Sequence, residues 1–115
     1  MTSETVRLLF KAIDESDWRM LRKFFHEDIV YERPGYPFLT GIDRVLEFYQ
    51  HERIIADGKH HLERIIVDNQ TMACWGRITG LSKDGKEVNE GFADVYECEG
   101  GKVKFRRSYF FRPAV

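Results

Sequence analysis

The second half of the chain limits the possible folds most, because it consists of four strand-like segments separated by turn signals. Asp84-Gly85 is a strong signal for a tight hairpin, Gly100-Gly101 turns the chain again, and Asp68-Asn69-Gln70 marks a third turn. The expected strands cover residues 60–67, 71–81, 88–98 and 103–112. Strands joined by such short turns pair in sequence order, so this half predicts an antiparallel meander.

The first half of the chain indicates helices and one further strand. Apolar residues recur at helical spacing over residues 3–14 and predict an amphipathic helix. Ser16 or Asp17 can cap a second helix. Residues 29–33 then predict a strand, which should end at Pro34-Gly35.

A third helix is expected after Thr40. Asp43 stands three residues later, which is the spacing of a capping box with the shorter acid. Asp57-Gly58 is the expected end of this helix, because glycine readily adopts the left-handed conformation found after a helix C-terminus.

Length, charge and hydropathy narrow the class of protein. The chain has 115 residues, a net charge of -1 and a pI near 6.4. We expect a single domain over residues 1–115, and the charge balance argues against a nucleic-acid-binding protein, which is normally basic. No apolar run approaches the roughly 18 residues of a membrane span, and the N-terminus lacks the apolar core of a signal peptide. We therefore expect a cytoplasmic protein that binds neither nucleic acid nor membranes, with Cys74 and Cys98 as free thiols.

The expected strand over residues 88–98 has two faces that are both largely non-polar. Alternation places Phe92, Asp94 and Tyr96 on one face. Gly91, Ala93 and Val95 share the other face. A sheet with two such faces should be covered on both sides. The helices would cover one side, and a second copy of the chain would cover the other, which predicts a homodimer.

Several short motifs follow one another in a characteristic order. They are DESDW (14–18), EDIVYERP (27–34), LTGIDRVLEFY (39–49), FADVY (92–96), GGKV (100–103) and RSYF (107–110). In this order, over nearly the whole chain, they resemble SnoaL-like and ketosteroid-isomerase-like proteins of the nuclear transport factor two-like superfamily. Their spacing is informative about the fold and says little about the function, because this fold hosts many activities.

The resemblance implies an α+β cone. In these proteins a strongly curved antiparallel sheet wraps around three N-terminal helices and leaves an internal pocket open at one end. Members include steroid isomerases, polyketide cyclases, dehydratases, epoxide hydrolases and non-catalytic binders, and many dimerise through the outer face of the sheet.

A position-by-position comparison implies that the catalytic site has changed. The isomerase tyrosine of the first helix matches Leu9, and the general-base aspartate matches Arg33. Only the second oxyanion donor is kept, as Asp94, and the catalytic aspartate of epoxide hydrolases and some cyclases matches Ser108. Because an arginine does not give up its proton in proteins, steroid isomerisation by that mechanism is not expected.

The resemblance and the strand alternation together indicate the site residues. We predict a buried ion pair between Asp94 and either Arg33 or Arg106, which would keep the carboxyl ionised at neutral pH. The predicted catalytic residues are Asp94, Arg33 and Tyr31, and the predicted pocket residues are Arg106, Ser108, Phe110, Phe92, Tyr96 and Phe48.

The histidines do not form a recognisable metal site. His60 and His61 are neighbours on an expected strand, so their side chains point to opposite faces, and no carboxylate or cysteine spacing completes a ligand set. Either histidine could instead reach the pocket as an acid or base, because its pKa lies near neutrality. No phosphate-binding loop is present, so we expect no metal, nucleotide or other cofactor.

Two classes of function fit these observations, and the sequence leaves open whether the protein is an enzyme. The leading hypothesis is a pocket protein for a small hydrophobic organic ligand. It could act as a cofactor-free isomerase, lyase or polyketide-cyclase-like enzyme on a carbonyl compound. The alternative is a non-catalytic dimeric module for ligand binding or interaction, which is favoured by the loss of the usual bases.

Overall fold

The second half of the chain forms the meander that the turn signals predict. The computed structural model describes residues 2–112, and their four C-terminal strands pair antiparallel in sequence order. These strands are β3 (Ile55–Asp68), β4 (Thr71–Ser82), β5 (Glu87–Glu99) and β6 (Lys102–Phe110). Only β3 differs much from expectation, because it begins five residues before His60.

The strand from the first half of the chain joins the same sheet, and it pairs with the meander in parallel. β1 (Phe25–Glu32) runs parallel to β6, and the short β2 (Leu39–Thr40) pairs antiparallel with β1. The order across the six-stranded sheet is β2-β1-β6-β5-β4-β3, so the sheet is mixed where a wholly antiparallel one was expected. α3 (Ile42–Glu47) and the first three strands of the meander lie between β1 and β6 in the chain, so no hairpin turn dictates how these two strands pair.

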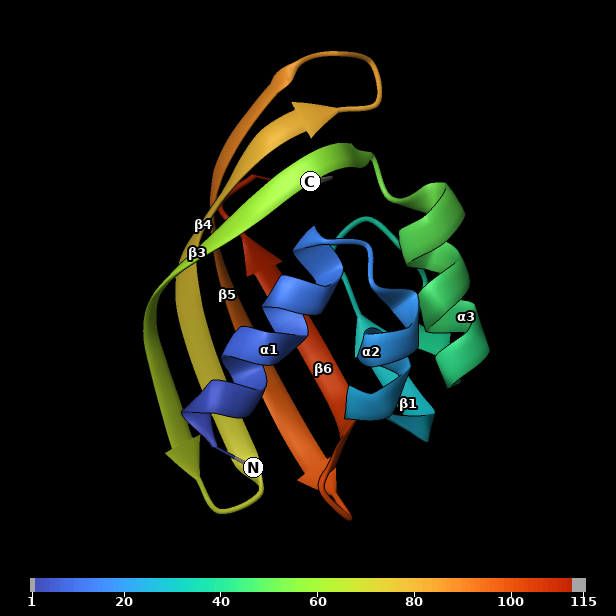
Figure 1. Cartoon of the computed structure of the whole chain (residues 1–115), viewed down its shortest axis with the longest axis vertical. Helices are drawn as coiled ribbons and strands as arrows, with labels where there is room; N and C mark the ends of the chain where they lie inside the picture. The colour runs from blue at the N-terminus through green and yellow to red at the C-terminus, as the bar shows by residue number, and fades with distance from the viewer. Residues whose placement is uncertain (1, 113–115) are drawn as a thin grey trace.

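Three helices lie on one side of the curved sheet, as Figure 1 shows. They are α1 (Ser3–Asp14), α2 (Trp18–Phe24) and α3 (Ile42–Glu47), and a π-helical turn, η1 (Phe48–Glu52), continues α3. Asp17 caps α2, because its Oδ1 accepts a hydrogen bond from the Met20 backbone N–H at 3.1 Å. No helix within residues 2–112 is long and apolar enough to cross a membrane.

The boundaries of α3 differ from those expected. Gly41 occupies the N-cap position without a side-chain cap, because Thr40 is paired with Val30 in the sheet. Gly58 pairs with Gly80 inside β3 and does not end the helix. The backbone groups around Gly58 are satisfied by pairing with β4, whereas at the end of a helix the last carbonyl groups would have lacked partners.

The core lies between the helices and the concave face of the sheet. The inward residues of α1, which include Leu9 and Phe10, are fully buried, and so are Phe92, Asp94 and Tyr96 of β5. The alternation expected for β5 is therefore confirmed on its inner face. The arrangement is the α+β cone that the resemblance implies.

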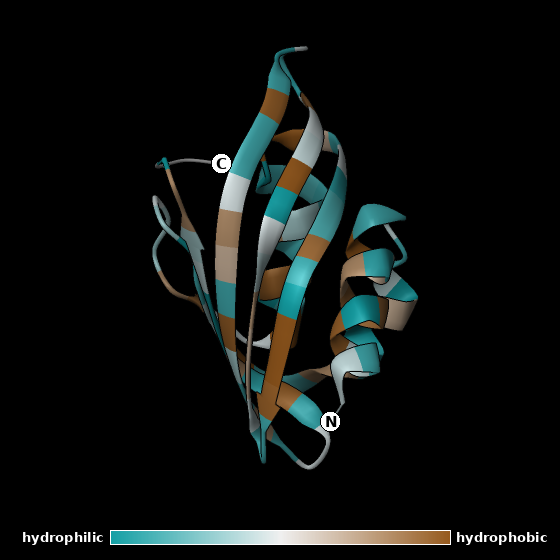
Figure 2. Ribbon diagram, turned by 90° about the vertical axis from the view of Figure 1, so that its left-hand side faces the viewer, coloured by the Kyte–Doolittle hydropathy of each residue, from teal (hydrophilic) through white to brown (hydrophobic). Residues whose placement is uncertain are grey.

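The outer face of the sheet carries apolar side chains in contact with solvent. Trp75, Ala93 and Tyr109 pair across β4, β5 and β6 in one row, and both aromatic residues are exposed. Gly91 is the exception on this face, because the ring of Phe111 covers it. Figure 2 shows hydrophobic and hydrophilic segments alternating along the strands on the side it presents.

β3 and β4 approach each other so closely at Gly76 that a larger residue does not fit there. Gly76 lies opposite Leu62, where the register of β3 shifts, and a Cβ there would meet the His61 carbonyl oxygen at 1.9 Å. Gly76→Ala should lower the free energy of unfolding by about 1–3 kcal/mol, because the rigid backbone of β3 must move. Urea denaturation of the two proteins measures this difference.

Gly91→Ala is the matched control on the neighbouring strand. The three atoms nearest a Cβ at Gly91 all belong to the Phe111 ring, and that residue is 80% exposed, so its ring can rotate away. This variant should lose much less stability than Gly76→Ala. Equal losses in the two variants would contradict the account of Gly76.

Candidate functional site

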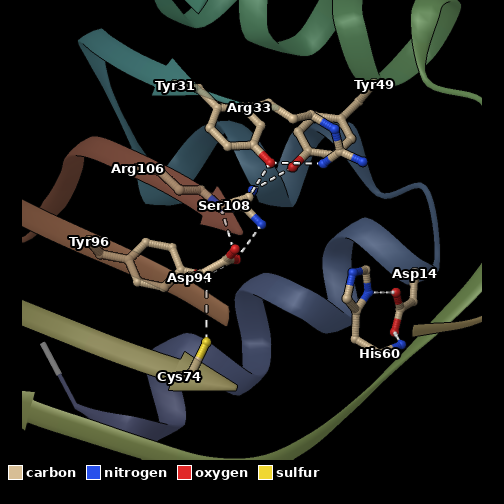
Figure 3. A network of polar contacts seen from close by, with 10 residues as sticks. All are labelled: Asp14, Tyr31, Arg33, Tyr49, His60, Cys74, Asp94, Tyr96, Arg106 and Ser108. Carbon is tan, nitrogen blue, oxygen red and sulfur yellow. Dashed lines mark hydrogen bonds and ion pairs between the residues drawn. The ribbon is translucent and has the colours of Figure 1, made fainter. Parts of the chain in front are cut away.

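A buried ion pair lies at the centre of the concave face. Arg106 donates hydrogen bonds to Asp94 Oδ2 from Nη2 at 2.8 Å and from Nε at 3.2 Å. Tyr96 donates to the same oxygen at 2.8 Å, and the two charged side chains are only 3% and 1% exposed. The ion pair expected from the sequence is therefore present, with Arg106 as the partner (Figure 3).

A second group of hydrogen bonds lies beside this pair. Arg33 Nη1 donates to the Tyr31 hydroxyl at 2.8 Å, and that hydroxyl is 2.7 Å from Ser108 Oγ. Arg106 also donates to the hydroxyl of Tyr49, and its guanidinium carbon lies 4.7 Å from the centre of the Tyr31 ring. Arg106 thus connects the two groups.

Sheet register explains why these residues meet. Tyr31, Arg106 and Tyr96 form one row across β1, β6 and β5. Ser108 and Asp94 face each other in the next inward row of β6 and β5. Because inward side chains of paired strands lie close together, both rows project into the same volume.

The environment keeps Asp94 ionised. Burial favours its neutral form, but the charge of Arg106 and the hydrogen bonds from Ser108, Arg106 and Tyr96 outweigh burial. The pKa of Asp94 therefore lies below its usual value, as expected. The carboxylate can accept a hydrogen bond or proton, and at neutral pH it has none to donate.

Tyr31 is made more acidic by its neighbours. Burial disfavours the phenolate, but the positive charges of Arg106 and Arg33 more than compensate, so the pKa of Tyr31 lies below 10. Such a phenol is a strong hydrogen-bond donor toward developing negative charge. Tyr49 behaves in the opposite way, because burial raises its pKa to about 12.

The two cysteines are free and buried. Cys74 Sγ lies 4.0 Å from the Tyr96 hydroxyl, next to Asp94. Burial, followed by the nearby carboxylate, raises the pKa of Cys74 to about 12. Since the thiolate is the reactive form, Cys74 is not activated as a nucleophile.

A separate polar pair lies between α1 and β3. His60 Nδ1 is 2.5 Å from Asp14 Oδ1, and the His60 backbone N–H donates to Asp14 Oδ2 at 2.9 Å (Figure 3). Burial lowers the pKa of His60 below 6.5, although Asp14 acts in the opposite direction. His60 is therefore neutral at pH 7, and donation from Nδ1 leaves the Nε2 lone pair as the basic position.

His60 is the histidine that points inward. Its ring centre lies 4.5 Å from the ring centre of Phe10. The guanidinium carbon of Arg106 lies 5.5 Å from the Phe10 ring centre. The neighbouring His61 is exposed and bonds Thr79 at 2.9 Å, as expected for the opposite face of the strand. One aromatic ring thus separates the histidine from the charged network.

The residues predicted from the sequence all face the interior. Arg33 is 4% exposed, and its guanidinium carbon lies 5.1 Å from the Phe48 ring centre and 4.8 Å from that of Phe110. Phe92 lies near the His60–Asp14 pair, because its ring centre is 5.3 Å from the ring centre of His60. The catalytic and ligand-binding roles assigned to these residues stay predictions.

Sequence reasoning missed three contributors to this interior: Asp14, Tyr49 and Arg53. Asp14 ends a helix, where an acid is ordinarily solvated. Tyr49 belongs to an apolar helical stripe, and its hydroxyl gave no separate signal. Arg53 follows η1 in a polar stretch, and nothing in the sequence distinguishes it from a surface arginine.

Aromatic and arginine side chains occupy much of the space inside the cone. Four well-formed hollows lie near the surface of the described residues, and Asp94, Arg106 and Tyr31 line none of these four. One hollow is lined by Phe10, Asp14 and His60, so it gives access to the histidine pair. The deeper internal pocket stays a prediction. Within residues 2–112, no three His, Cys, Asp or Glu side chains come together as a metal-binding group.

The family model for the SnoaL-like domain matches residues 6–105. The chain belongs to the SnoaL-like domain family. No curated protein sequence matches it significantly. The match includes every residue of the charged network except Ser108 and Arg106, which follow it directly on β6.

Solved structures of the same fold are similar to this SnoaL-like domain over almost its whole length. An NTF2-like protein of unknown function from Burkholderia pseudomallei has a TM-score of 0.86 at 19% identity, covering 96% of this chain and 92% of that one. A candidate SnoaL-like polyketide cyclase from Jannaschia sp. CCS1 has a TM-score of 0.83 at 16% identity, covering 94% and 83%. An LEH-like epoxide hydrolase from M. tuberculosis has a TM-score of 0.79 at 19% identity, covering 93% and 80%. At these low identities, the structural similarity establishes the fold alone.

Removing one partner of the buried ion pair should destabilise the domain strongly. We expect Asp94→Asn to lower the free energy of unfolding by about 3–5 kcal/mol, because it leaves Arg106 buried without a counter-charge. The double variant Asp94→Leu/Arg106→Met should lose less, since it removes both charges. Equal or greater loss in the double variant would contradict this account.

The stability difference between the parent protein and Asp94→Asn should depend on pH in a defined direction. The folded-state pKa of Asp94 is lowered, so its stabilising effect is complete above the unfolded-chain value of about 3.9 and is lost as the pH falls through the folded value. The stability difference between the parent protein and Asp94→Asn should therefore be constant at neutral pH and shrink in strong acid. Urea denaturation at a series of pH values measures it.

Proposed function

We propose that the cone binds a small hydrophobic carbonyl compound and catalyses a cofactor-free acid–base reaction on it, of the isomerase, lyase or cyclase type. The observation that carries this proposal is the His60–Asp14 pair. A neutral histidine oriented by a carboxylate is a general base with a pKa suited to work near neutrality.

The first step would be removal of a proton from the carbon next to the carbonyl group. His60 Nε2 accepts this proton, the electrons of the C–H bond form a carbon–carbon double bond, and the π electrons of the carbonyl group move to its oxygen, which gives an enolate. The proton held on His60 can then return at another carbon, giving isomerisation, or protonate a leaving group, giving elimination. In a cyclase the enolate carbon would instead attack a second carbonyl group, whose oxygen takes the proton.

Cationic and phenolic donors would stabilise the enolate oxygen. Arg33 and Tyr31 form a hydrogen-bonded pair, and the lowered pKa of Tyr31 makes it a good donor to an oxyanion. Asp94 serves this arrangement as the hydrogen-bond partner that fixes Arg106. Phe10, which contacts both His60 and Arg106, would lie against the substrate between base and oxyanion donors.

The comparisons support the proposal at the level of the fold. One neighbour is a candidate polyketide cyclase and another is an LEH-like epoxide hydrolase, and both names denote reactions of small organic molecules. The chain departs from the family pattern by carrying an arginine where the isomerases have their base. A base supplied from β3 would restore the missing element at another place.

The proposed base can be tested without knowing the substrate. 2-Tetralone, a hydrophobic ketone, exchanges its acidic protons for deuterium in D₂O, and NMR follows the rate. The protein should accelerate this exchange, and His60→Gln should remove about 10²–10⁴-fold of the acceleration. The rate should rise with pH through the His60 pKa, which lies below 6.5, and level off above it, because only the neutral imidazole is a base.

His61→Gln is the matched control. It removes the adjacent histidine, which is exposed on the other face of β3, and should leave the rate unchanged. Equal losses in the two variants, or no acceleration by the parent protein, would count against the proposed chemistry.

A non-catalytic dimeric module remains the second candidate. The observation that favours it is the dense packing of tyrosine and arginine side chains inside the cone, combined with the exposed apolar outer face. We propose in either case that the protein is a homodimer through the row Trp75, Ala93 and Tyr109, where small Ala93 lets two sheets approach closely.

The homodimer is testable by sedimentation. The parent protein should be dimeric at micromolar concentration, and Trp75→Glu should shift it to monomer by placing a charge in the interface. Leu8→Glu changes an equally exposed leucine on α1, 42% against 38% exposed, and should leave the dimer intact. A monomeric parent protein would overturn this proposal.

A further inference from the structure

The largest of the four hollows lies apart from the His60–Asp14 pair. It measures about 690 Å³, within the range of small-molecule pockets, and shares no lining residue with the hollow beside His60. It lies where the turn between β4 and β5, at the top of Figure 1, meets the end of η1. The Lys83 backbone N–H donates to the Ile54 carbonyl at 2.8 Å and holds these two segments together. Ile54 and Val88 give the hollow its apolar wall.

Glu90 is the buried acid of this hollow. It is 3% exposed, whereas the other acids that line the hollow are exposed. Cross-strand pairing places Glu90 in one row with Ile78 of β4 and His60 of β3, on the inner face of the sheet. Ile78, which is itself buried, separates Glu90 from His60, so the two ionisable groups line different hollows. A carboxylate buried in this way requires a cation as its partner.

Arg112 is that partner, and it lies largely in solvent. Arg112 Nε donates to Glu90 Oε2 at 2.6 Å, and no other side chain within residues 2–112 bonds this carboxylate. The side chain of Arg112 is 74% exposed, against 4% for that of Glu90. An ion pair with a solvent-exposed partner contributes little, because water competes for the exposed charge. Arg112 also lines the hollow, so a cation that enters the hollow meets the same carboxylate.

The remaining charges around the hollow favour a cation over an anion. Acids outnumber basic side chains among its lining residues by four to three. Both lysines have other contacts, since Lys83 Nζ donates to the His51 carbonyl at 3.2 Å and Lys86 Nζ lies 3.7 Å from Asp84 Oδ2. An anion in the hollow would have to displace these contacts, and Glu90 would repel it.

We propose that this hollow binds a small hydrophobic primary amine, whose ammonium group replaces Arg112 at Glu90. An ammonium group has three N–H donors and forms short, charge-assisted hydrogen bonds with a carboxylate. Ile54 and Val88 pack against the apolar body of the amine. Arg112 is an internal competitor, which occupies the acid while no amine is bound. The site does not involve His60, so it is independent of the proposed acid–base reaction.

Two probes of similar shape that differ in charge test this proposal. Isothermal titration calorimetry of the full chain at pH 7 compares benzylamine, which is protonated, with neutral benzyl alcohol. We expect benzylamine to bind at least about tenfold more tightly, because only benzylamine brings a cation to Glu90. Glu90→Gln should abolish this preference, and Glu97→Gln, which changes an exposed acid of β5, should keep it.

Arg112→Met separates a binding site from an ion pair that only stabilises the fold. Loss of the competitor should tighten benzylamine binding about two- to fivefold, which is the size expected for an ion pair with an exposed partner. Removal of one or the other member of the ion pair would then change the affinity in opposite directions. A purely structural pair predicts no increase in affinity from Arg112→Met, because benzylamine would not bind the released carboxylate.

The other results would overturn the proposal. Equal binding of the two probes, or binding of neither, would exclude amine recognition by this hollow. A preference for benzylamine that survives Glu90→Gln would place the ammonium group elsewhere. An unchanged or lower affinity of Arg112→Met for benzylamine would exclude Arg112 as a competitor. None of these results bears on the exchange of 2-tetralone, which depends on His60.

Discussion

The buried ion pair between Asp94 and Arg106 is the interaction on which the interior of this domain depends. Two charges removed from water are stable only when each is compensated, and here the compensation comes from β5, β6, β1 and η1. Tyr96 donates to the carboxylate, and Tyr49 accepts from the guanidinium. The pair therefore fixes the relative positions of the sheet and the helical layer, and it makes the concave face a polar centre within an aromatic shell.

Two acid–base environments of different character lie within this one cone. Around Asp94, positive charge and hydrogen bonds overcome burial, and the carboxyl stays ionised. Around His60, burial overcomes the attraction of Asp14, and the imidazole stays neutral. Environments that set the protonation of neighbouring groups independently are the usual basis for assigning acid and base roles. Phe10 touches both His60 and Arg106, so a substrate next to this ring would be exposed to both environments.

The change from an acid to an arginine at position 33 alters the charge balance of the whole site. In the isomerases that the sequence resembles, acids face the cavity from the positions of Arg33 and Asp94. Here one of the two is a cation, and Arg53 and Arg106 add two more. The aromatic rings packed against the three guanidinium groups stabilise them only in part, since a cation–π contact replaces little of the hydration that burial removes.

The local features of the fold were predictable from the sequence, because they depend on local rules. Tight turns such as Asp84-Gly85 set the order of the meander, and the helical spacing over residues 3–14 gave α1 with its bounds. Alternation along β5 placed Asp94 inward between two aromatic residues, and an arginine of the same cavity was the expected partner. The end of α3 and the parallel pairing of β1 with β6 were not predictable, because pairing between distant strands decided both.

The partners of the site were decided only by the tertiary structure. Asp14 and His60 are 46 residues apart, and Tyr31 and Ser108 are 77 residues apart, so no local pattern connects either pair. The sequence determined which side chains of each strand point inward, since alternation is a property of the strand itself. The curvature of the sheet and the packing of α1 against β3 decided which of these side chains meet, because burial forces every inward polar group to find a partner across the core.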